Sequence, residues 1–405
     1  MRLAVISPFL DRRHGTERCV IEQLERFSAR PDVEIHIYAQ RVADLPGVIR
    51  YEPGAAARPG PRLLWHKVPS IPGPHILQYI FWFFANRVAR WWDARMRGLH
   101  CDLVYSPGIN ALDADVITVH IVFHEFYRRV RSHLRLRGTP IAAWPRLVHR
   151  QLYYRLLMAL ERNLYPRRQI HLAAVSDLVA LQLRQFFGRT VVRVIRNGVS
   201  MDRFSPSLTR ARRAAVREEF HLCGADFVLL LIGNDWKKKG LDSLLHCLAT
   251  CRELPLKLLV VGSDERIPYL RPIRDLDIMD RVLFLDPSPD VVQFYAAADA
   301  YVGPSLEDAY GLPILEAMAC GLPVIASVRA GASEIISDGE NGLLLRDPEN
   351  FQELAALLRR LCADASLRLR MGEAAAGTAA QQSWDCNAAG TWELLNAALA
   401  QKRPQ

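Results

Sequence analysis

The chain has 405 residues, of which 50% are hydrophobic and 23% are charged, a composition that excludes fibrous and disordered classes. The length predicts two domains of roughly 200 residues each. The net charge of +9 is uneven, because residues 1–200 carry 30 Lys and Arg against 15 Asp and Glu, whereas the rest is mildly acidic. The basic half predicts an anionic partner: a phospholipid surface, a phosphorylated acceptor or nucleic acid.

Strand and helix patterns alternate along the first half, and residues 53–75, rich in Pro, Gly and Ala, predict a loop between them. The predicted strands are 3–9, 33–39, 102–108, 115–123, 170–175 and 191–199. The predicted helices are 18–30, 75–98 and 177–188. Residues 128–168 carry eleven arginines and one acid, Glu161, and predict a helix with an apolar stripe at Leu152, Leu156, Leu157 and Leu160.

A second alternating series follows, with predicted strands at 226–233, 256–262, 281–286, 300–305 and 323–327. Two such series predict an α/β fold with two Rossmann-like domains and mostly parallel sheets. We expect the domains at 1–203 and 204–383, a linker near 202–209, and a helix in 384–405 that packs back on the first domain. Ligands of such sheets bind beyond the carboxyl ends of the strands, so the expected site is the interdomain cleft.

The cysteines and the chain start favour a reducing, cytosolic compartment. Eight cysteines are scattered without paired spacing, and no signal peptide precedes the first predicted strand. Cys247 and Cys251 lie one helical turn apart, which suits metal ligation, but without a second pair we interpret them as core residues. The longest apolar run, 76–85, is shorter than the roughly 20 residues of a membrane span.

The most informative segment is Gly303 to Ser327. Asp308 and Glu316 are separated by seven residues, and a helix beginning at Leu312 would place Asp308 before it and Glu316 within it. A helix N-terminus suits a phosphate, and the carboxylates suit sugar and ribose hydroxyls as acceptors. On spacing alone, a capped helix with an ordinary acidic residue is an equally good interpretation.

This segment resembles the acid-x7-acid motif of retaining glycosyltransferases of family 4, which have the GT-B fold of two Rossmann-like domains facing each other across a cleft. The resemblance implies that Asp308 lies beside the donor sugar and that Glu316 binds the nucleotide ribose. It also implies donor contacts from Tyr310, Gly311 and Leu312. The family usually has Glu at the first position, so the shorter Asp308 leaves the donor sugar open.

A second resemblance covers residues 229–245, which are similar to the family's strand–loop–helix segment ending in Lys-Gly. It implies that Lys239 binds the donor diphosphate, with Gly240 at the helix start. Asn234 stands where the family often has Arg, and Lys238 is the candidate for the second positive charge. The alternative is a solvated lysine run.

Weaker resemblances fall in the first half. The loop with Gly15 and Thr16 resembles the family's loop after the first strand, whose backbone contacts the donor or acceptor. His120, at a predicted strand end, resembles the histidine facing the donor sugar, although a structural histidine is an equally good interpretation. With Asp308 and Lys239, it completes the implied catalytic set. The turn at 197–198 is interpreted as architectural.

No metal or cofactor is expected, only a nucleotide diphosphate sugar as donor substrate. Asp113-Ala114-Asp115 could be taken for a metal-binding DxD motif, but it precedes an apolar strand and is interpreted as a turn. Residues 262–265 are likewise interpreted as a turn at a strand end. Cationic side chains and helix N-termini would compensate the diphosphate charge.

The resemblance implies a hexosyltransferase that uses a UDP- or GDP-linked sugar and a lipid-linked or saccharide acceptor, in cell-envelope glycan or lipopolysaccharide biosynthesis. Its motifs are nearest to lipopolysaccharide core glucosyltransferases. The aromatic segment 76–92 predicts either contact with an anionic membrane surface or a cover for the acceptor cleft. We therefore expect a cytoplasmic protein, peripheral at the inner face of the cytoplasmic membrane. The alternatives are a sugar-nucleotide epimerase of the same fold and a basic nucleic-acid-binding protein; nucleic acid is not expected, because no recognised binding motif accompanies the arginines.

Overall fold

The structure is a computed structural model that describes residues 1–12, 15–51, 63–131 and 144–402. It comprises two compact units, and each is described by itself. Unit 1 consists of Met1–Arg196 and Trp384–Gln405, and unit 2 of Asn197–Ser383. The chain leaves unit 1 after Arg196, ahead of the residue 203 expected from the sequence, and returns to it at Trp384.

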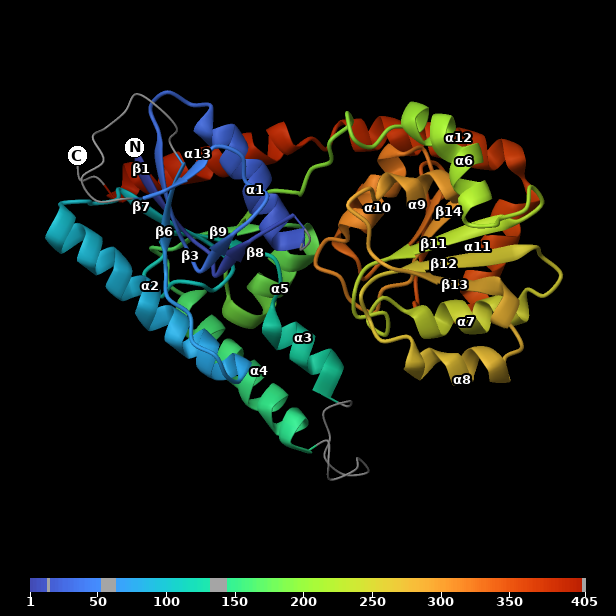
Figure 1. Ribbon diagram of the computed structural model, residues 1–405, viewed down its shortest axis with the longest axis horizontal. Coiled ribbons are helices and arrows are strands. Elements are labelled where there is room, and N and C mark those ends of the chain that lie inside the picture. The colour runs from blue at the N-terminus through green and yellow to red at the C-terminus, as the bar shows by residue number, and fades with distance from the viewer. Residues whose placement is uncertain (13–14, 52–62, 132–143, 403–405) are drawn as a thin grey trace. The chain divides into compact units, whose positions relative to one another are not determined.

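Unit 1 is built on a parallel sheet (Figure 1). In spatial order its strands are β10 (Arg193–Val194), β9 (His171–Ala174), β8 (Val116–Val119), β7 (Leu103–Pro107), β1 (Arg2–Ile6), β3 (Glu34–Ala39), β6 (Leu63–Lys67) and β5 (Val48–Arg50). The short strands β2 (Phe9–Leu10) and β4 (Arg41–Val42) form a separate parallel pair. The prediction of a mostly parallel sheet is confirmed for this unit.

The helices of unit 1 are α1 (Gly15–Ser28), α2 (His75–Arg97), α3 (Phe123–Val130), α4 (Trp144–Leu164), α5 (Asp177–Phe187) and α13 (Trp384–Lys402). The last of these, α13, packs against α1 and against β7, β8 and β9. Phe27 of α1 meets Trp392 of α13 with ring centroids 5.4 Å apart, and the Gln23 amide donates to Asn387 Oδ1 at 2.8 Å. The final helix therefore completes the core of unit 1.

The structure corrects one expectation in unit 1 and adds detail to another. The loop predicted over 53–75 is wrong for Leu63–Lys67, which form β6; residues 53–62 of that prediction lie outside the described residues. Pairing with both β3 and β5 stabilises β6, although its neighbourhood is rich in turn-forming residues. On α4, the four leucines of the expected apolar stripe differ in exposure: Leu157 is buried, whereas Leu152 is half exposed.

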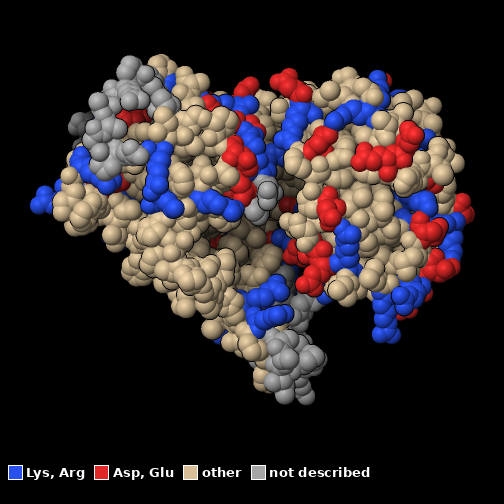
Figure 2. Space-filling view, viewed as in Figure 1, with Lys and Arg blue, Asp and Glu red and all other residues tan. Residues whose placement is uncertain are grey.

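The surface over α2 is mostly uncharged in the view of Figure 2. This helix carries the aromatic segment singled out in the sequence, and its helical prediction is confirmed. Among the helices that the structure describes, none has both the length and the apolar character that crossing a bilayer requires.

Unit 2 contains a second, wholly parallel sheet. In spatial order its strands are β13 (Val282–Leu285), β12 (Leu256–Val261), β11 (Phe227–Ile232), β14 (Ala300–Gly303), β15 (Val324–Ser327) and β16 (Leu343–Leu345). Its helices are α6 (Pro206–Glu219), α7 (Leu241–Thr250), α8 (Ile267–Asp275), α9 (Val292–Ala297), α10 (Leu312–Ala319), α11 (Phe351–Ala363) and α12 (Ala365–Ala380), with 3-10 turns at Met279–Arg281 and Gly331–Ile335. Each of the five strands predicted from the sequence in this half is present.

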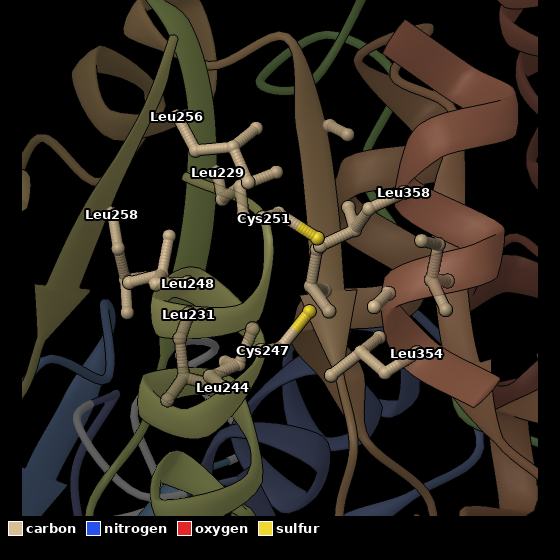
Figure 3. Close-up of a cluster of buried hydrophobic side chains, with 14 of the residues drawn as sticks. Leu229, Leu231, Leu244, Cys247, Leu248, Cys251, Leu256, Leu258, Leu354 and Leu358 are labelled. Carbon is tan, nitrogen blue, oxygen red and sulfur yellow. The ribbon is translucent and has the colours of Figure 1, made fainter. Parts of the chain in front are cut away.

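A leucine-rich core between the sheet and α7, α8 and α11 supports unit 2 (Figure 3). Cys247 and Cys251 are fully buried in this core, with both sulfurs pointing toward α11, and their interpretation as core residues is confirmed. The core fixes the strands, and so it fixes the loops that follow their carboxyl ends.

Candidate functional site

Lys239 lies in the loop that joins β11 to α7, in unit 2. Two glycines shape this loop. Gly233 has φ 142°, and a Cβ there would lie 2.9 Å from Lys239 Cε, so the lysine side chain lies directly against the backbone. Gly240 has φ 79° and directly precedes α7, as the resemblance implied. The loop therefore places Lys239 two residues before the first residue of a helix.

Asp308 lies in the loop between β14 and α10, and its side chain contacts Lys239. The distance from Lys239 Nζ to Asp308 Oδ2 is 2.5 Å, and the two side chains are 17% and 18% exposed. The residues meet because β11 and β14 are neighbours in the sheet, so the loops after their carboxyl ends lie side by side. A sheltered cation and carboxylate thus stand where α/β sheets bind ligands.

The ion pair keeps Asp308 ionised. Burial alone would raise the pKa of Asp308, but the positive charges of Lys239 and Lys238 outweigh it and hold this pKa below its usual value. Hydrogen bonds from the Lys239 ammonium and from the Tyr310 backbone act in the same direction. The site therefore presents a charged acceptor and a charged donor at neutral pH.

The lowered pKa of Asp308 predicts a pH-dependent stability. A carboxyl whose folded pKa is depressed stabilises the fold above its unfolded pKa, about 3.9, and this contribution is lost as pH falls through the lower folded value. We expect the difference in melting temperature between the native protein and Asp308→Asn to be constant at neutral pH and to shrink below about pH 4. Thermal melts from pH 7 to pH 3 measure it, with the exposed Asp286→Asn as control. A difference that is the same at every pH would contradict the assignment.

Glu316 lies inside α10 and is 4% exposed. Its Oε2 accepts a hydrogen bond from the Tyr295 hydroxyl at 2.6 Å, and Tyr295 is itself fully buried. Burial and the Glu316 charge raise the pKa of Tyr295 well above its usual value, so this hydroxyl stays a donor. The expectation that Asp308 precedes this helix and Glu316 lies within it is confirmed.

Asn234 and Lys238 connect the β11–α7 loop to neighbouring loops. Asn234 Oδ1 accepts from the backbone N–H of Ser263, which follows β12, at 2.9 Å. The Lys238 carbonyl accepts from the backbone N–H of Leu306, in the β14–α10 loop, at 2.8 Å. These bonds fix three strand-end loops relative to one another.

Tyr310, Gly311 and Leu312 continue the β14–α10 loop into the helix. The Tyr310 hydroxyl donates to the Asn197 carbonyl at 2.8 Å, so this hydroxyl is occupied within unit 2. Gly311 has φ 92°, and a Cβ there would lie 3.4 Å from Asp308 Oδ2. Leu312 is the first residue of α10. Gly311 thus leaves room beside the Asp308 carboxylate, directly before a helix N-terminus.

Three of the expected site residues belong to unit 1. His120 directly follows β8, and burial lowers its pKa to about 4. Its Nε2 is buried and has no hydrogen-bond partner among the described residues, so a neutral ring with an unused nitrogen stands at this strand end. Gly15 and Thr16 form the first turn of α1, where Gly15 is exposed.

The Asp113-Ala114-Asp115 turn uses its carboxylates within unit 1. The Asp113 carboxylate accepts hydrogen bonds from both terminal nitrogens of Arg90, at 2.7 and 2.9 Å. Asp115 accepts from the Val104 N–H and from Lys402, both at 2.8 Å. Within the described ranges, no group of three or more His, Cys, Asp or Glu side chains is arranged to hold a metal ion.

The sequence reasoning missed two residues that shape the site. Tyr295 holds Glu316, and Asn197 was interpreted as part of an architectural turn although its carbonyl holds Tyr310. Neither contact joins neighbours in the sequence, and each is made by residues far apart in the chain. No local pattern carries that information.

Comparison with known proteins finds a family model that covers the part of the chain carrying this site. Residues 213–378 match the family model described as glycosyl transferases group 1. This match includes the Lys239 loop, Asp308 and Glu316.

The similar proteins are glycosyltransferases. A D-inositol 3-phosphate glycosyltransferase of Nocardia farcinica is 34% identical over 234 residues, which cover 54% of this chain and 51% of that protein. The chain thus spans about half the length of the curated relatives it matches. WaaG, a glycosyltransferase involved in lipopolysaccharide biosynthesis, has a TM-score of 0.73 at 21% identity, over 97% of this chain and 98% of WaaG. HepE of Anabaena, in complex with UDP-glucose, has a TM-score of 0.69 at 20% identity, over 98% and 100%.

The structural likeness to WaaG and HepE covers nearly the whole chain, at identities that show the fold alone. The chain has the α/β GT-B fold with parallel sheets in two domains, and the predicted fold class is confirmed.

Proposed function

We propose that the protein is a retaining hexosyltransferase of family 4, which transfers a sugar from a UDP- or GDP-linked donor to a lipid-linked or saccharide acceptor of the cell envelope. The observation that carries the proposal is the contact of Lys239 with Asp308 at the carboxyl ends of β11 and β14, beside two helix N-termini. The family match over 213–378 and the HepE complex with UDP-glucose support a nucleotide-sugar donor.

In this proposal the diphosphate of the donor replaces Asp308 as the partner of Lys239. The ammonium group and the N-termini of α7 and α10 then stabilise the negative charge that develops on the leaving diphosphate. Asp308, released from its ion pair, accepts a hydrogen bond from a hydroxyl of the donor sugar. These positive groups need no metal or other cofactor to balance the diphosphate.

The buried carboxylate of Glu316 takes the ribose hydroxyls, and Asn234 and Lys238 hold the loop that carries Lys239. Transfer breaks the bond from the anomeric carbon to the diphosphate and forms one to the acceptor oxygen. In the proposed retaining reaction both occur on one face of the sugar, and the leaving phosphate takes the acceptor's proton. His120 hydrogen-bonds the sugar, and Gly15 and Thr16 offer backbone groups.

The charge of residues 1–200 bears on the nature of the proposed acceptor. The excess of Lys and Arg in residues 1–200 favours an anionic acceptor, and the Nocardia relative is named for an acceptor that carries a phosphate. A lipid-linked acceptor is presented at a membrane surface, so we place the protein at the inner face of the cytoplasmic membrane. Lipopolysaccharide or another envelope glycan is the proposed product.

Glu316→Ala should abolish most of the stabilisation that a nucleotide gives the native protein. Loss of a hydrogen bond to a charged group costs about 1.5–3 kcal/mol, which corresponds to binding about 10- to 100-fold weaker. Thermal shifts with UDP, GDP, ADP and their sugar conjugates measure the effect and identify the base. Glu373→Ala, an exposed glutamate of α12, is the matched control and should respond like the native protein.

The same panel tests the function itself. Two results together support a transferase. One nucleotide stabilises the protein, and the nucleoside diphosphate is released from its sugar conjugate only when an acceptor is added. Failure of every nucleotide at millimolar concentration would overturn the proposal.

A further inference from the structure

The outer face of α2 is a continuous apolar stripe exposed to solvent. Seven large side chains form it and are between 38% and 67% exposed: Leu77, Ile80, Phe84, Val88, Trp91, Trp92 and Met96. Their spacing follows one side of a helix, and the stripe is about 28 Å long at 1.5 Å per residue. Soluble surfaces rarely leave so many large apolar groups contiguous without a partner.

The inner face of α2 packs against other residues of unit 1. The exposed stripe is therefore not the face that α2 contributes to the core of that unit. The Trp82 indole donates to the Asn110 carbonyl at 3.0 Å, and Trp82 is 1% exposed. Near the other end, Asp93 accepts from the Tyr38 hydroxyl at 2.9 Å and contacts His66 at 2.7 Å. The helix is held along its length with the apolar side outward.

The exposed charges that α2 itself carries have one sign. The only acidic residue of α2 is Asp93, which is buried and paired with Arg97. Arg87 and Arg95 are exposed on α2, and within the described residues neither has an ion-pair partner closer than 4.0 Å. Trp91 and Trp92 are the side chains that suit a boundary between water and hydrocarbon.

The neighbouring helix α4 has the same character. Tyr79 of α2 and Tyr153 of α4 have ring centroids 5.6 Å apart, so the two helices pack together. On α4, Trp144, Val148 and Leu152 are exposed at a spacing of four residues. Its exposed charges are arginines, and its one acid, Glu161, is fully buried.

We propose that the α2 stripe, with the exposed side of α4, docks on the surface of an anionic phospholipid bilayer. Aromatic and aliphatic side chains of α2 enter the headgroup boundary to a depth of about 5–10 Å, and the arginines contact lipid phosphates. Charge selects this occupant over a second copy of the chain, because two copies of one arginine-bearing stripe would repel each other. The inference extends the membrane-side part of the proposed function and assigns it to a defined face.

Vesicle binding tests the α2 stripe without any transfer reaction. A lack of vesicle binding is therefore distinguishable from a failure of the transferase proposal. The full chain is sedimented with vesicles of phosphatidylcholine alone and with 30% phosphatidylglycerol, at low and high salt. We expect binding to the anionic vesicles, weakened by salt, and quenching of tryptophan fluorescence by brominated lipid. The triple variant Phe84→Ser, Val88→Ser and Trp91→Ser should bind at least tenfold more weakly, with an unchanged melting temperature.

The matched control replaces three exposed apolar residues of unit 2, Leu208→Ser, Ile267→Ser and Leu369→Ser, and should bind like the native protein. Equal binding by the α2 variant, or no binding by the native protein, overturns the proposal. A dimer in solution that the α2 substitutions dissociate overturns it as well and assigns the face to a second copy. If the α2 triple variant has a lower melting temperature than the native protein, fluorescence quenching by brominated lipid is measured on Trp91→Phe instead. This substitution keeps the α2 stripe apolar and should lose part of the quenching.

Discussion

Replacing Lys239 by alanine should lower kcat/KM for the nucleotide-sugar donor by about 10²- to 10³-fold, the usual effect of removing one preorganised group that stabilises developing negative charge. The ammonium group contacts Asp308, and no other side chain reaches Asp308 within 4.0 Å as an ion-pair partner in the described part of the chain. Steady-state kinetics with the donor identified by thermal shift measure the loss. Lys237→Ala, an exposed lysine of the same loop, should retain native kinetics.

Loss of Lys239 also leaves a sheltered carboxylate unpaired, which would itself destabilise the fold. The double variant with Asp308→Asn removes that charge and separates the two effects. We expect the double variant to regain melting temperature relative to Lys239→Ala while its turnover stays low. Recovery of turnover together with stability would show that Lys239 is structural and not a ligand of the diphosphate.

Gly240→Ala should destabilise unit 2 and move the Asp308 loop. A Cβ at this position would lie 2.0 Å from the Pro304 carbonyl oxygen, and the residue has φ 79°. Strain from the left-handed backbone costs about 1–3 kcal/mol, and overpacking adds about 1–3 kcal/mol. Since Pro304 belongs to the β14–α10 loop, nucleotide binding should weaken as well. Denaturant unfolding measures the free energy.

Gly377→Ala provides the control for Gly240→Ala. Gly377 is exposed within α12 and nothing lies within 4 Å of its added Cβ, so alanine should stabilise the helix by about 1 kcal/mol. Equal effects of the two substitutions would show that the close contact between Gly240 and Pro304 does not constrain the loop.

The strands of unit 2 could be predicted from the sequence because a buried parallel strand is a short apolar run between turn residues, as in residues 256–262. The same reasoning failed at β6, where Leu63–Lys67 are short and follow a stretch rich in Pro and Gly. Their strand conformation comes from pairing with β3 and β5, which is a property of the tertiary structure.

Motif resemblance predicted candidate site residues in unit 2, but it did not predict the contacts between them. Lys239 and Asp308 are 69 residues apart and meet only because β11 and β14 are adjacent in the sheet. Strand order cannot be read from periodicity, which reports only the local exposure of side chains. The hydrogen bond from Tyr295 to Glu316 also depends on the tertiary structure. Tyr295 lies in α9 and Glu316 in α10, and β14 separates these two helices in the chain.

The position of α13 has a consequence for synthesis of the chain. Unit 2 is one continuous segment, whereas unit 1 needs Trp384–Lys402 to cover Phe27 and to satisfy the Gln23 amide. While the chain emerges from the ribosome, unit 2 is complete before unit 1 can close its core. Residues 1–196 are therefore made before unit 2 but reach their final packing after it, and until then the apolar side of α1 stays exposed to chaperones and to aggregation.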